Sequence, residues 1–274
     1  MLPNVIGIGA EKSGSTWLYA LLKSHPEIYM SERRKEIDFF NRNYEKGLSW
    51  YESFFPDGQA VSETPVIGEY SPSYLYFSEC PERMARIKPI QKLLLIVRNP
   101  ADQMYSYYGQ AIRVLNYQKT FEDFLQEEPK FLSRGFNGRN IKPFLEFYDR
   151  EKILCLKFEN AVKNIEDTKR KVANFLNVDP EKFPTDAGVN RENQSYIPKF
   201  KKLNRVAGQF RRTLIKQDQD WLINLAKSAG VMQLLKKGSM ENLPPMNRES
   251  RQRLLDYYRQ DIEEFEEMLG INSK

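Results

Sequence analysis

The first twenty residues constrain the fold of this chain more than any other stretch. Residues 5–9, Val-Ile-Gly-Ile-Gly, form a short β-branched run that is typical of a buried parallel strand. A turn of small residues follows, and residues 17–23 then form an apolar run of helical character. A strand, a tight turn and a helix start direct several backbone N–H groups to one point, where the helix N-terminus adds about half a positive charge. The pattern predicts an anion-binding turn after the first strand.

The turn at residues 10–16, Ala-Glu-Lys-Ser-Gly-Ser-Thr, contains the groups that a phosphate needs. Gly14 allows a positive φ and a close approach of the ligand, while Lys12 supplies a mobile cation. Ser15 and Thr16 offer hydroxyl donors and a helix cap. The lysine precedes the glycine, unlike the Gly-Lys-[Ser/Thr] order of nucleotide hydrolases, whose hydroxyl binds magnesium. A glycine turn can also simply join a strand to a helix, but the lysine inside it favours phosphate binding.

Length and composition limit the remaining possibilities. The 274 residues suffice for one α/β domain, and we expect a single domain over residues 1–274, with a flap and helical extension at residues 190–247. The net charge of +5 suits an anionic ligand but is too diffuse to indicate a nucleic-acid partner. The two cysteines, Cys80 and Cys155, make neither a disulfide framework nor a zinc set. With no apolar span and no leader sequence in view, we expect a soluble, cytoplasmic protein.

Other apolar runs predict the rest of a central parallel sheet flanked by helices. Residues 66–70 and 153–158 are expected to be strands, and residues 93–97, the most hydrophobic run, are expected to be the central strand. Helices are predicted for residues 47–55, 81–92, 121–127, 141–150, 167–176, 205–237 and 248–269. The fold class is therefore α/β, with a P-loop-like phosphate-binding loop after its first strand.

A second group of anion-binding candidates follows the run at residues 93–97. Arg98 comes directly after it, and because buried strands do not tolerate an arginine inside, we expect Arg98 at the carboxyl edge of the sheet. We expect a helix to begin at Pro100, and Ser106 lies about two helical turns after Arg98. An arginine fork and a serine hydroxyl can hold one phosphate together, although this pair alone is weak evidence.

Residues 33–40, Arg-Arg-Lys-Glu-Ile-Asp-Phe-Phe, join a charged cluster to an aromatic pair. The pattern suggests a short element whose polar end lines a cleft, and a solvated charge run would have the same composition. His25, the only histidine, is interpreted as a packing residue at a helix end. A general base elsewhere in the chain must therefore be a residue other than histidine.

Together these motifs resemble those of a sulfotransferase that uses 3′-phosphoadenosine 5′-phosphosulfate (PAPS). Residues 12–17 resemble the family's loop for the 5′-phosphosulfate, and residues 95–100 with Ser106 resemble its 3′-phosphate motif. The likeness extends almost continuously to about residue 189 and is nearest to the heparan-sulfate-type and bacterial branch. The segments that carry this closer likeness are residues 35–40, 46–51 and 71–74, and residues 157–159 and 174–176 also follow the family pattern.

The resemblance implies a role for each matching residue. Lys12 would bind the 5′-phosphate and neutralise charge on the leaving group. Glu36 would be the general base that removes the acceptor's proton for in-line attack on sulfur. Arg98 and Ser106 would hold the 3′-phosphate, which distinguishes PAPS and its product PAP from ATP, and no metal is implied. The implied cofactor contacts are Lys12, Ser13, Gly14, Ser15, Thr16, Trp17 (stacked on adenine), Arg98, Ser106 and, from a third loop, Tyr196 and Lys199.

The acceptor contacts suggest a departure from heparan sulfate. Asp38 stands where the heparan-sulfate enzymes usually have a histidine, and Tyr70 where they usually have a lysine, whereas Gln110 is retained. Loss of these contacts argues against a polyanionic acceptor and favours a smaller hydroxyl acceptor, such as a sugar, a lipid head group or a polyketide-like alcohol. The expected acceptor contacts are Lys35, Asp38, Tyr70, Tyr74, Tyr108, Gln110 and Arg113.

Two other functions remain open at the level of sequence. A P-loop kinase acting on a small molecule or nucleotide would need magnesium and an acidic ligand at a strand end, where this chain has Arg98. A catalytically idle nucleotide- or glycan-binding module would need neither Lys12 nor Glu36, and both are present.

Overall fold

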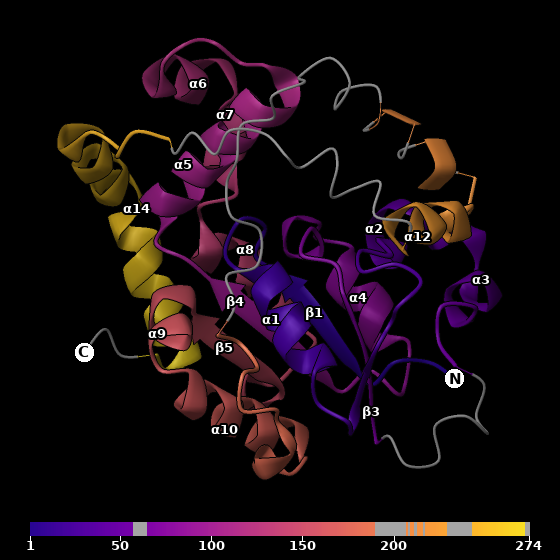
Figure 1. The fold of residues 1–274 in the computed structure, drawn as a ribbon. Coiled ribbons are helices and arrows are strands. Elements are labelled where there is room, and N and C mark those ends of the chain that lie inside the picture. Colours follow the sequence, from indigo (N-terminus) through magenta and orange to yellow (C-terminus); the bar gives the residue numbers. More distant parts are fainter. Residues whose placement is uncertain are drawn as a thin grey trace.

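The fold is built on a parallel β-sheet of five strands (Figure 1). The computed structural model describes residues 1–56, 65–189, 207, 209–210, 213–215, 217–228 and 243–271. The strands follow the order β2-β3-β1-β4-β5, and each adjacent pair is parallel. Their bounds are β1 Val5–Gly9, β2 Ile28–Met30, β3 Val66–Tyr70, β4 Lys92–Val97 and β5 Ile153–Lys157. The predicted α/β class with a central parallel sheet is confirmed.

The centre of the sheet differs from the sequence prediction. The middle strand is β1, and the more hydrophobic β4 lies beside it, between β1 and β5. Both strands have neighbours on two sides and helices on two faces, so hydrophobicity alone could not rank them. Strand β2 was not predicted, because three residues are too few to show a pattern.

Helices connect the strands and cover both faces of the sheet (Figure 1). The α-helices are α1 Ser15–Lys23, α2 Phe39–Arg42, α3 Leu48–Glu52, α4 Cys80–Ala85, α5 Pro100–Gln110, α6 Phe121–Glu127, α7 Pro129–Ser133, α8 Asn137–Leu145, α9 Phe158–Lys163, α10 Ile165–Leu176, α12 Asp220–Ser228 and α14 Arg248–Leu269. The 3₁₀ turns are η1 Tyr44–Lys46, η3 Tyr74–Tyr76, η5 Arg150–Lys152 and η6 Pro180–Lys182, and η4 Ala111–Leu115 is a π-helical turn that continues α5.

Most predicted helices are present, with shifted ends. Helices α6 and α14 have the predicted bounds. Helix α4 ends at Ala85, well before the predicted residue 92, because Pro89 disfavours helix before it and β4 begins at Lys92. The predicted helix at 205–237 and the predicted flap fall largely outside the described residues. In the described part of the chain, no helix is both long and apolar enough to cross a membrane.

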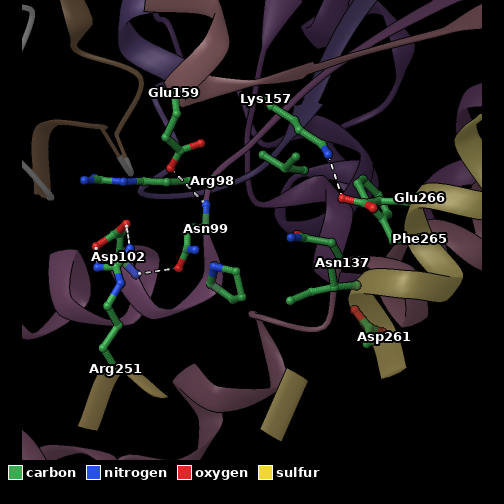
Figure 2. A pocket seen from close by; sticks show the side chains of 13 residues that line it. Arg98, Asn99, Asp102, Asn137, Lys157, Glu159, Arg251, Asp261, Phe265 and Glu266 are labelled. Carbon is green, nitrogen blue, oxygen red and sulfur yellow. Dashed lines mark hydrogen bonds and ion pairs between the residues drawn. The ribbon is translucent and has the colours of Figure 1, made fainter. Parts of the chain in front are cut away.

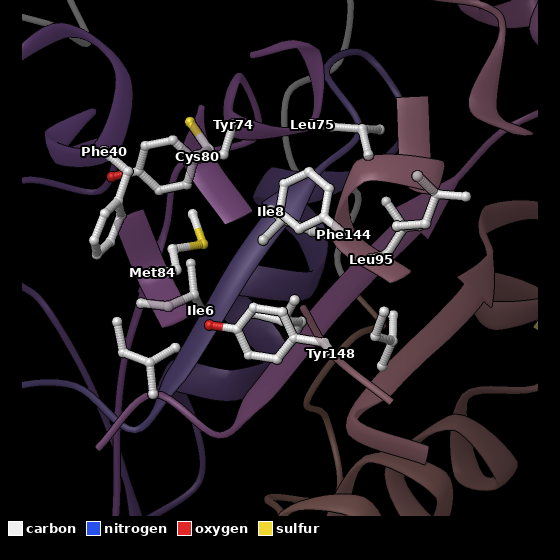
Figure 3. Close-up of a cluster of buried hydrophobic side chains, with 14 of the residues drawn as sticks. Ile6, Ile8, Phe40, Tyr74, Leu75, Cys80, Met84, Leu95, Phe144 and Tyr148 are labelled. Atoms are coloured by element: carbon white, nitrogen blue, oxygen red, sulfur yellow. The ribbon is translucent and has the colours of Figure 1, made fainter. Parts of the chain in front are cut away.

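Two hydrophobic clusters hold the helices against the sheet. Ile6 and Ile8 of β1 point to one face, where they meet side chains of α4 and α8 such as Met84 and Phe144 (Figure 3). Val5 points to the other face, toward α1, α9 and α10. The period of two along β1 thus places one strand in both halves of the core.

His25 is part of the packing at the end of α1. Its ring is 1% exposed, and Nδ1 accepts a hydrogen bond from the Glu27 N–H at 3.1 Å. The proton of the neutral ring is therefore on Nε2, which donates to the Asp179 carbonyl at 2.8 Å. The ring also meets Phe183 edge-on, with 4.5 Å between ring centres. The interpretation of His25 as a packing residue is confirmed.

Gly7 in the middle of β1 offers a test of this packing. The Tyr70 ring covers it so closely that an added Cβ would lie 2.2 Å from Tyr70 Cδ2. We expect Gly7→Ala to lower the free energy of unfolding by about 1–3 kcal/mol, because a buried ring must move. Gly68→Ala, in the neighbouring strand, is the milder comparison, since an added Cβ there would meet the flexible Met30 sulfur at 2.9 Å and the Val5 carbonyl oxygen at 3.2 Å but no ring. Urea denaturation of both variants measures the difference, and equal losses would contradict the packing argument.

Candidate functional site

The turn between β1 and α1 has the backbone of an anion-binding loop. Lys12 and Gly14 both have left-handed φ values, 63° and 96°. A Cβ on Gly14 would also lie 2.2 Å from the Phe158 ring, so conformation and space both require glycine. Helix α1 has no side-chain cap and no acidic residue in its first turn. Its first N–H groups and the positive end of its dipole are thus left for an anion.

Lys12 lies in a cluster of charges. The pKa of Lys12 is lowered to about 8, first by burial and then by the positive charges of Arg113 and Arg98. The negative charges of Glu11 and Glu36 raise it. Because all four groups influence Lys12, their charges lie close to it. They come from the residues after β1, the end of β4, the π-helical turn η4 and the segment before α2. Three cations around one buried turn favour an anionic ligand.

Glu11 anchors the turn from behind. Tyr107 of α5 donates to Glu11 Oε2 at 2.9 Å, and Arg134 forms an ion pair with the same carboxylate. Gln103 Nε2 donates to the Glu11 carbonyl at 2.8 Å. Sequence reasoning missed this role, since the partners lie about a hundred positions away and only the place of Glu11 beside Lys12 hinted at it.

The segment that carries Glu36 approaches the same turn. The Glu36 side chain is 53% exposed, and its Oε1 lies 3.4 Å from Lys35 Nζ. Lys35 Nζ also donates to Thr16 Oγ1 at 2.9 Å, in the first turn of α1. Burial lowers the pKa of Lys35, while the Glu36 carboxylate raises it. Lys35 therefore connects the segment that carries Glu36 to the start of α1. Thr16 accepts this bond and does not cap the helix as predicted.

Arg98 leaves the end of β4 as predicted. Its guanidinium carbon lies 5.4 Å from the centre of the Phe158 ring. Its Nε is buried and has no hydrogen-bond partner in the described part of the chain. Asn99 caps α5 by accepting from the Ala101 N–H at 3.0 Å. Ser106 is half-buried two turns into α5. An unpartnered Arg98 donor beside a helix start fits an anion.

A cavity of about 310 Å³ lies against Arg98 (Figure 2). Helix α14 closes its far side through two ion pairs. Lys157 at the end of β5 lies 2.6 Å from Glu266, and Arg251 binds both oxygens of Asp102 at 2.6 and 2.8 Å. These pairs fasten the C-terminal helix to the carboxyl edge of the sheet. Nothing in the local sequence indicated them, because partners about 110 to 150 positions apart leave no pattern.

Three predicted contacts are buried away from the site, which corrects the sequence analysis. Trp17 is 5% exposed and its Nε1 donates to the Gly188 carbonyl at 2.8 Å, so the indole is not available to stack on adenine. Tyr70 is fully buried over β1 and donates to the Gly9 carbonyl at 2.7 Å. Tyr74 is fully buried and donates to Glu69 at 2.8 Å. Burial of these large aromatic side chains stabilises the core, so they are not exposed to a ligand.

The other predicted acceptor contacts have varied surroundings. Asp38 Oδ1 accepts from Ser73 at 2.6 Å, and burial raises the pKa of this carboxyl. The Tyr108 hydroxyl donates to the Lys119 carbonyl at 2.9 Å, within the aromatic packing of α5 and α6. Gln110 is exposed at the end of α5, and Arg113 is half-buried in η4. Ser13 and Ser15 are buried in the turn, whereas Tyr196 and Lys199 lie outside the described residues.

Among the described residues, no set of three or more His, Cys, Asp or Glu side chains is arranged to hold a metal ion.

The family assignment follows from comparison of the whole chain with known proteins. The family described as "Sulfotransferase domain" matches residues 2–216. The chain belongs to the sulfotransferase family. The match confirms the resemblance seen in the motifs and leaves the kinase reading without support.

Individual relatives and structures agree with this assignment. The bifunctional heparan sulfate N-deacetylase/N-sulfotransferase 4 of Mus musculus is 27% identical over 287 residues, which cover 98% of this chain and 30% of that protein. The heparan sulfate glucosamine 3-O-sulfotransferase 3A1 of Mus musculus is 24% identical over 278 residues, 98% of this chain and 63% of that protein. This chain thus spans less than two thirds of either relative. A solved sulfotransferase from Alicyclobacillus acidocaldarius shares the fold, with a TM-score of 0.69, 20% identity and coverage of 99% and 97%.

The titration of Lys12 tests the charge cluster directly. We expect one lysine Cε resonance of ¹³C-labelled protein to titrate near pH 8, and Lys12→Met to remove it. Arg113→Ala should raise this pKa, because a neighbouring positive charge is lost, whereas Glu11→Gln should lower it. A Lys12 resonance that titrates near the ordinary value of 10.5 would contradict the proposed cluster.

Proposed function

We propose that this chain transfers a sulfuryl group from PAPS to the hydroxyl of a small-molecule or carbohydrate acceptor, leaving PAP. The observation that carries the proposal is the electrostatic cluster of Lys12, Arg98 and Arg113 with Glu36 at the β1–α1 turn. When bound, PAPS supplies the activated sulfuryl group and a phosphate leaving group. The chain supplies the binding of two phosphates and a base for the acceptor.

The phosphate contacts are proposed for residues whose donors suit them. The uncapped start of α1 and the charge of Lys12 suit the 5′ side, where the charge also stabilises the leaving phosphate. The unpartnered Nε of Arg98, with Ser106, suits the 3′-phosphate. We retain as cofactor contacts Lys12, Ser13, Gly14, Ser15, Thr16, Arg98, Ser106 and, from sequence alone, Tyr196 and Lys199.

Glu36 is proposed as the general base. An exposed carboxylate beside the phosphate loop can accept the proton of an acceptor hydroxyl as that oxygen attacks. Lys35 contacts both Glu36 and Thr16, so it keeps the base near the turn that would hold the leaving group. The proposed base and the proposed leaving-group contacts thus lie on two connected segments, which supports an in-line transfer.

The acceptor is proposed to be smaller and less charged than a heparan chain. Asp38 adds a carboxyl beside the base, and Tyr70 presents no polar atom outward because its hydroxyl is bonded to Gly9 inside the core. Lys35, Gln110 and Arg113 remain as proposed acceptor contacts. Cys80 and Cys155 are both unpaired thiols, which suits the reducing cytoplasm that we propose as the compartment.

Replacement of the base should separate binding from chemistry. We expect Glu36→Gln to lower kcat by about 10²–10⁴-fold, since the neutral amide cannot take the proton. The affinity for PAP should stay within about twofold, because Glu36 is not a phosphate contact. A radiolabelled PAPS assay across an acceptor panel and calorimetry with PAP measure the two effects. Unchanged kcat would remove Glu36 from the role of base.

Ligand-induced stabilisation tests the 3′-phosphate site without any turnover. We expect PAP to raise the free energy of unfolding by about 2.7 kcal/mol at a hundredfold excess over its Kd, and ADP to do far less. Arg98→Ala should remove most of the difference between PAP and ADP. Arg86→Ala is the control, because that side chain is 63% exposed just after α4 and pairs with Glu82. Stabilisation by magnesium-ATP as strong as that by PAP would contradict the proposal.

A further inference from the structure

Glu69 is a fully buried carboxylate at the end of β3, directly behind the segment that carries Glu36. Three hydroxyl groups donate to it. Tyr51 and Tyr74 donate to Oε1 at 2.9 and 2.8 Å, and Ser71 donates to Oε2 at 2.9 Å. The three donors favour the charged form of this carboxylate, whereas its burial opposes that form.

Two of these hydroxyl groups also accept a hydrogen bond from a backbone N–H group. The Tyr74 oxygen accepts from the Phe39 N–H at 2.8 Å, and the Ser71 oxygen accepts from the Asp38 N–H at 3.0 Å. An ionised carboxylate can only accept, so both hydroxyl protons must face Glu69. Their lone pairs are then directed at the two backbone N–H groups. One buried charge therefore fixes the direction of both hydrogen-bond chains.

These chains hold an unusual point in the backbone. Asp38 has a left-handed φ of 53°, which is unfavourable for a residue with a Cβ, and α2 begins at the next residue. Glu36 lies two residues before this turn, so the direction in which the chain leaves it sets where the Glu36 carboxylate lies. Ile37, which lies between Glu36 and Asp38, is fully buried, so tight packing fixes the backbone that joins these two residues.

We propose that Glu69 is a positioning residue for the reaction: its charged carboxylate orients Tyr74 and Ser71, which hold the Asp38–Phe39 turn and thereby hold Glu36 at the acceptor hydroxyl. The inference rests on the proposed role of Glu36 as base and adds a residue that never touches the acceptor. Tyr74, expected from sequence to bind the acceptor, belongs to this relay.

The charge state of Glu69 gives the relay a pH dependence. The pKa of Glu69 is raised to about 7 because burial, helped by the Asp38 charge, outweighs the three hydroxyl donors, which lower it. Cys80 and the two tyrosines also face it, and the pKa values of all three thiol and phenol groups are raised, so they stay neutral near pH 7. When the pH falls through about 7, Glu69 takes a proton and one hydroxyl loses its acceptor.

Stability should change in the opposite direction. The pKa of Glu69 is higher in the folded chain than its ordinary value of 4.5, so between pH 4.5 and 7 the folded state binds more protons than the unfolded state. This group's contribution to stability is thus present at low pH and is lost as the pH rises through about 7. A positioning role makes kcat rise over the same interval, whereas a purely structural role makes kcat follow stability.

The matched pair Tyr74→Phe and Tyr51→Phe tests the relay. Both tyrosines are fully buried, both donate to Glu69 Oε1, and each substitution removes one hydroxyl. Of the two, Tyr74 alone is bonded to the Phe39 N–H. We expect roughly ten- to hundredfold lower kcat for Tyr74→Phe and less than about threefold for Tyr51→Phe, with KM for PAPS unchanged in both. Equal losses of kcat would overturn the inference.

Amide hydrogen exchange provides a readout that does not depend on turnover. Exchange at Phe39, followed by NMR, should accelerate at least about tenfold in Tyr74→Phe but not in Tyr51→Phe, and exchange at both Asp38 and Phe39 should accelerate in Glu69→Gln. Glu69→Gln should also remove the rise of kcat near pH 7. If the wild-type chain shows no sulfuryl transfer, the proposed function fails, and unchanged exchange at both amides would separately refute the relay.

Discussion

The concentration of positive charge in the buried turn after β1 is the interaction on which the site depends. Burial and the positive charges of Arg113 and Arg98 lower the pKa of Lys12, so the turn stores electrostatic repulsion among its cations. That repulsion is tolerable because Glu11 lies next to Lys12 and is itself held by Tyr107 and Arg134. An anion bound in the turn would relieve the repulsion, and this is the physical reason that the geometry favours a ligand with phosphate groups.

Two carboxylates behind the site act in the same way. Glu11 lies after the central strand and receives donors from α5 and the end of α7, while Glu69 lies at the end of the neighbouring strand and receives three hydroxyls. Each fixes the direction of its donors because a charged carboxylate accepts and never donates. Glu11 holds the turn between β1 and α1, and Glu69 holds the Asp38–Phe39 turn through Ser71 and Tyr74. The parallel sheet brings both strand ends to one edge, so both loops are held from one rigid layer.

The C-terminal helix completes this edge from the far end of the chain. The Arg251–Asp102 and Lys157–Glu266 pairs join α14 to the starts of the segments that follow β4 and β5 (Figure 2). The Arg98 side of the site is therefore shaped by residues from the middle and from the C-terminal part of the sequence.

The sequence alone determined the local features: the strand, turn and helix around Gly14, the place of Arg98 at a strand end and the bounds of α6. Each rests on neighbours within a few residues, where propensity and sterics act directly. Only the tertiary structure decided that β1 is the middle strand, that Trp17 and Tyr70 are buried in the core, and that Glu69 lies behind the segment that carries Glu36. Burial and hydrogen bonding between distant residues depend on which faces of the elements pack together. The sequence does not distinguish an aromatic side chain that contacts a ligand from one that packs on a strand.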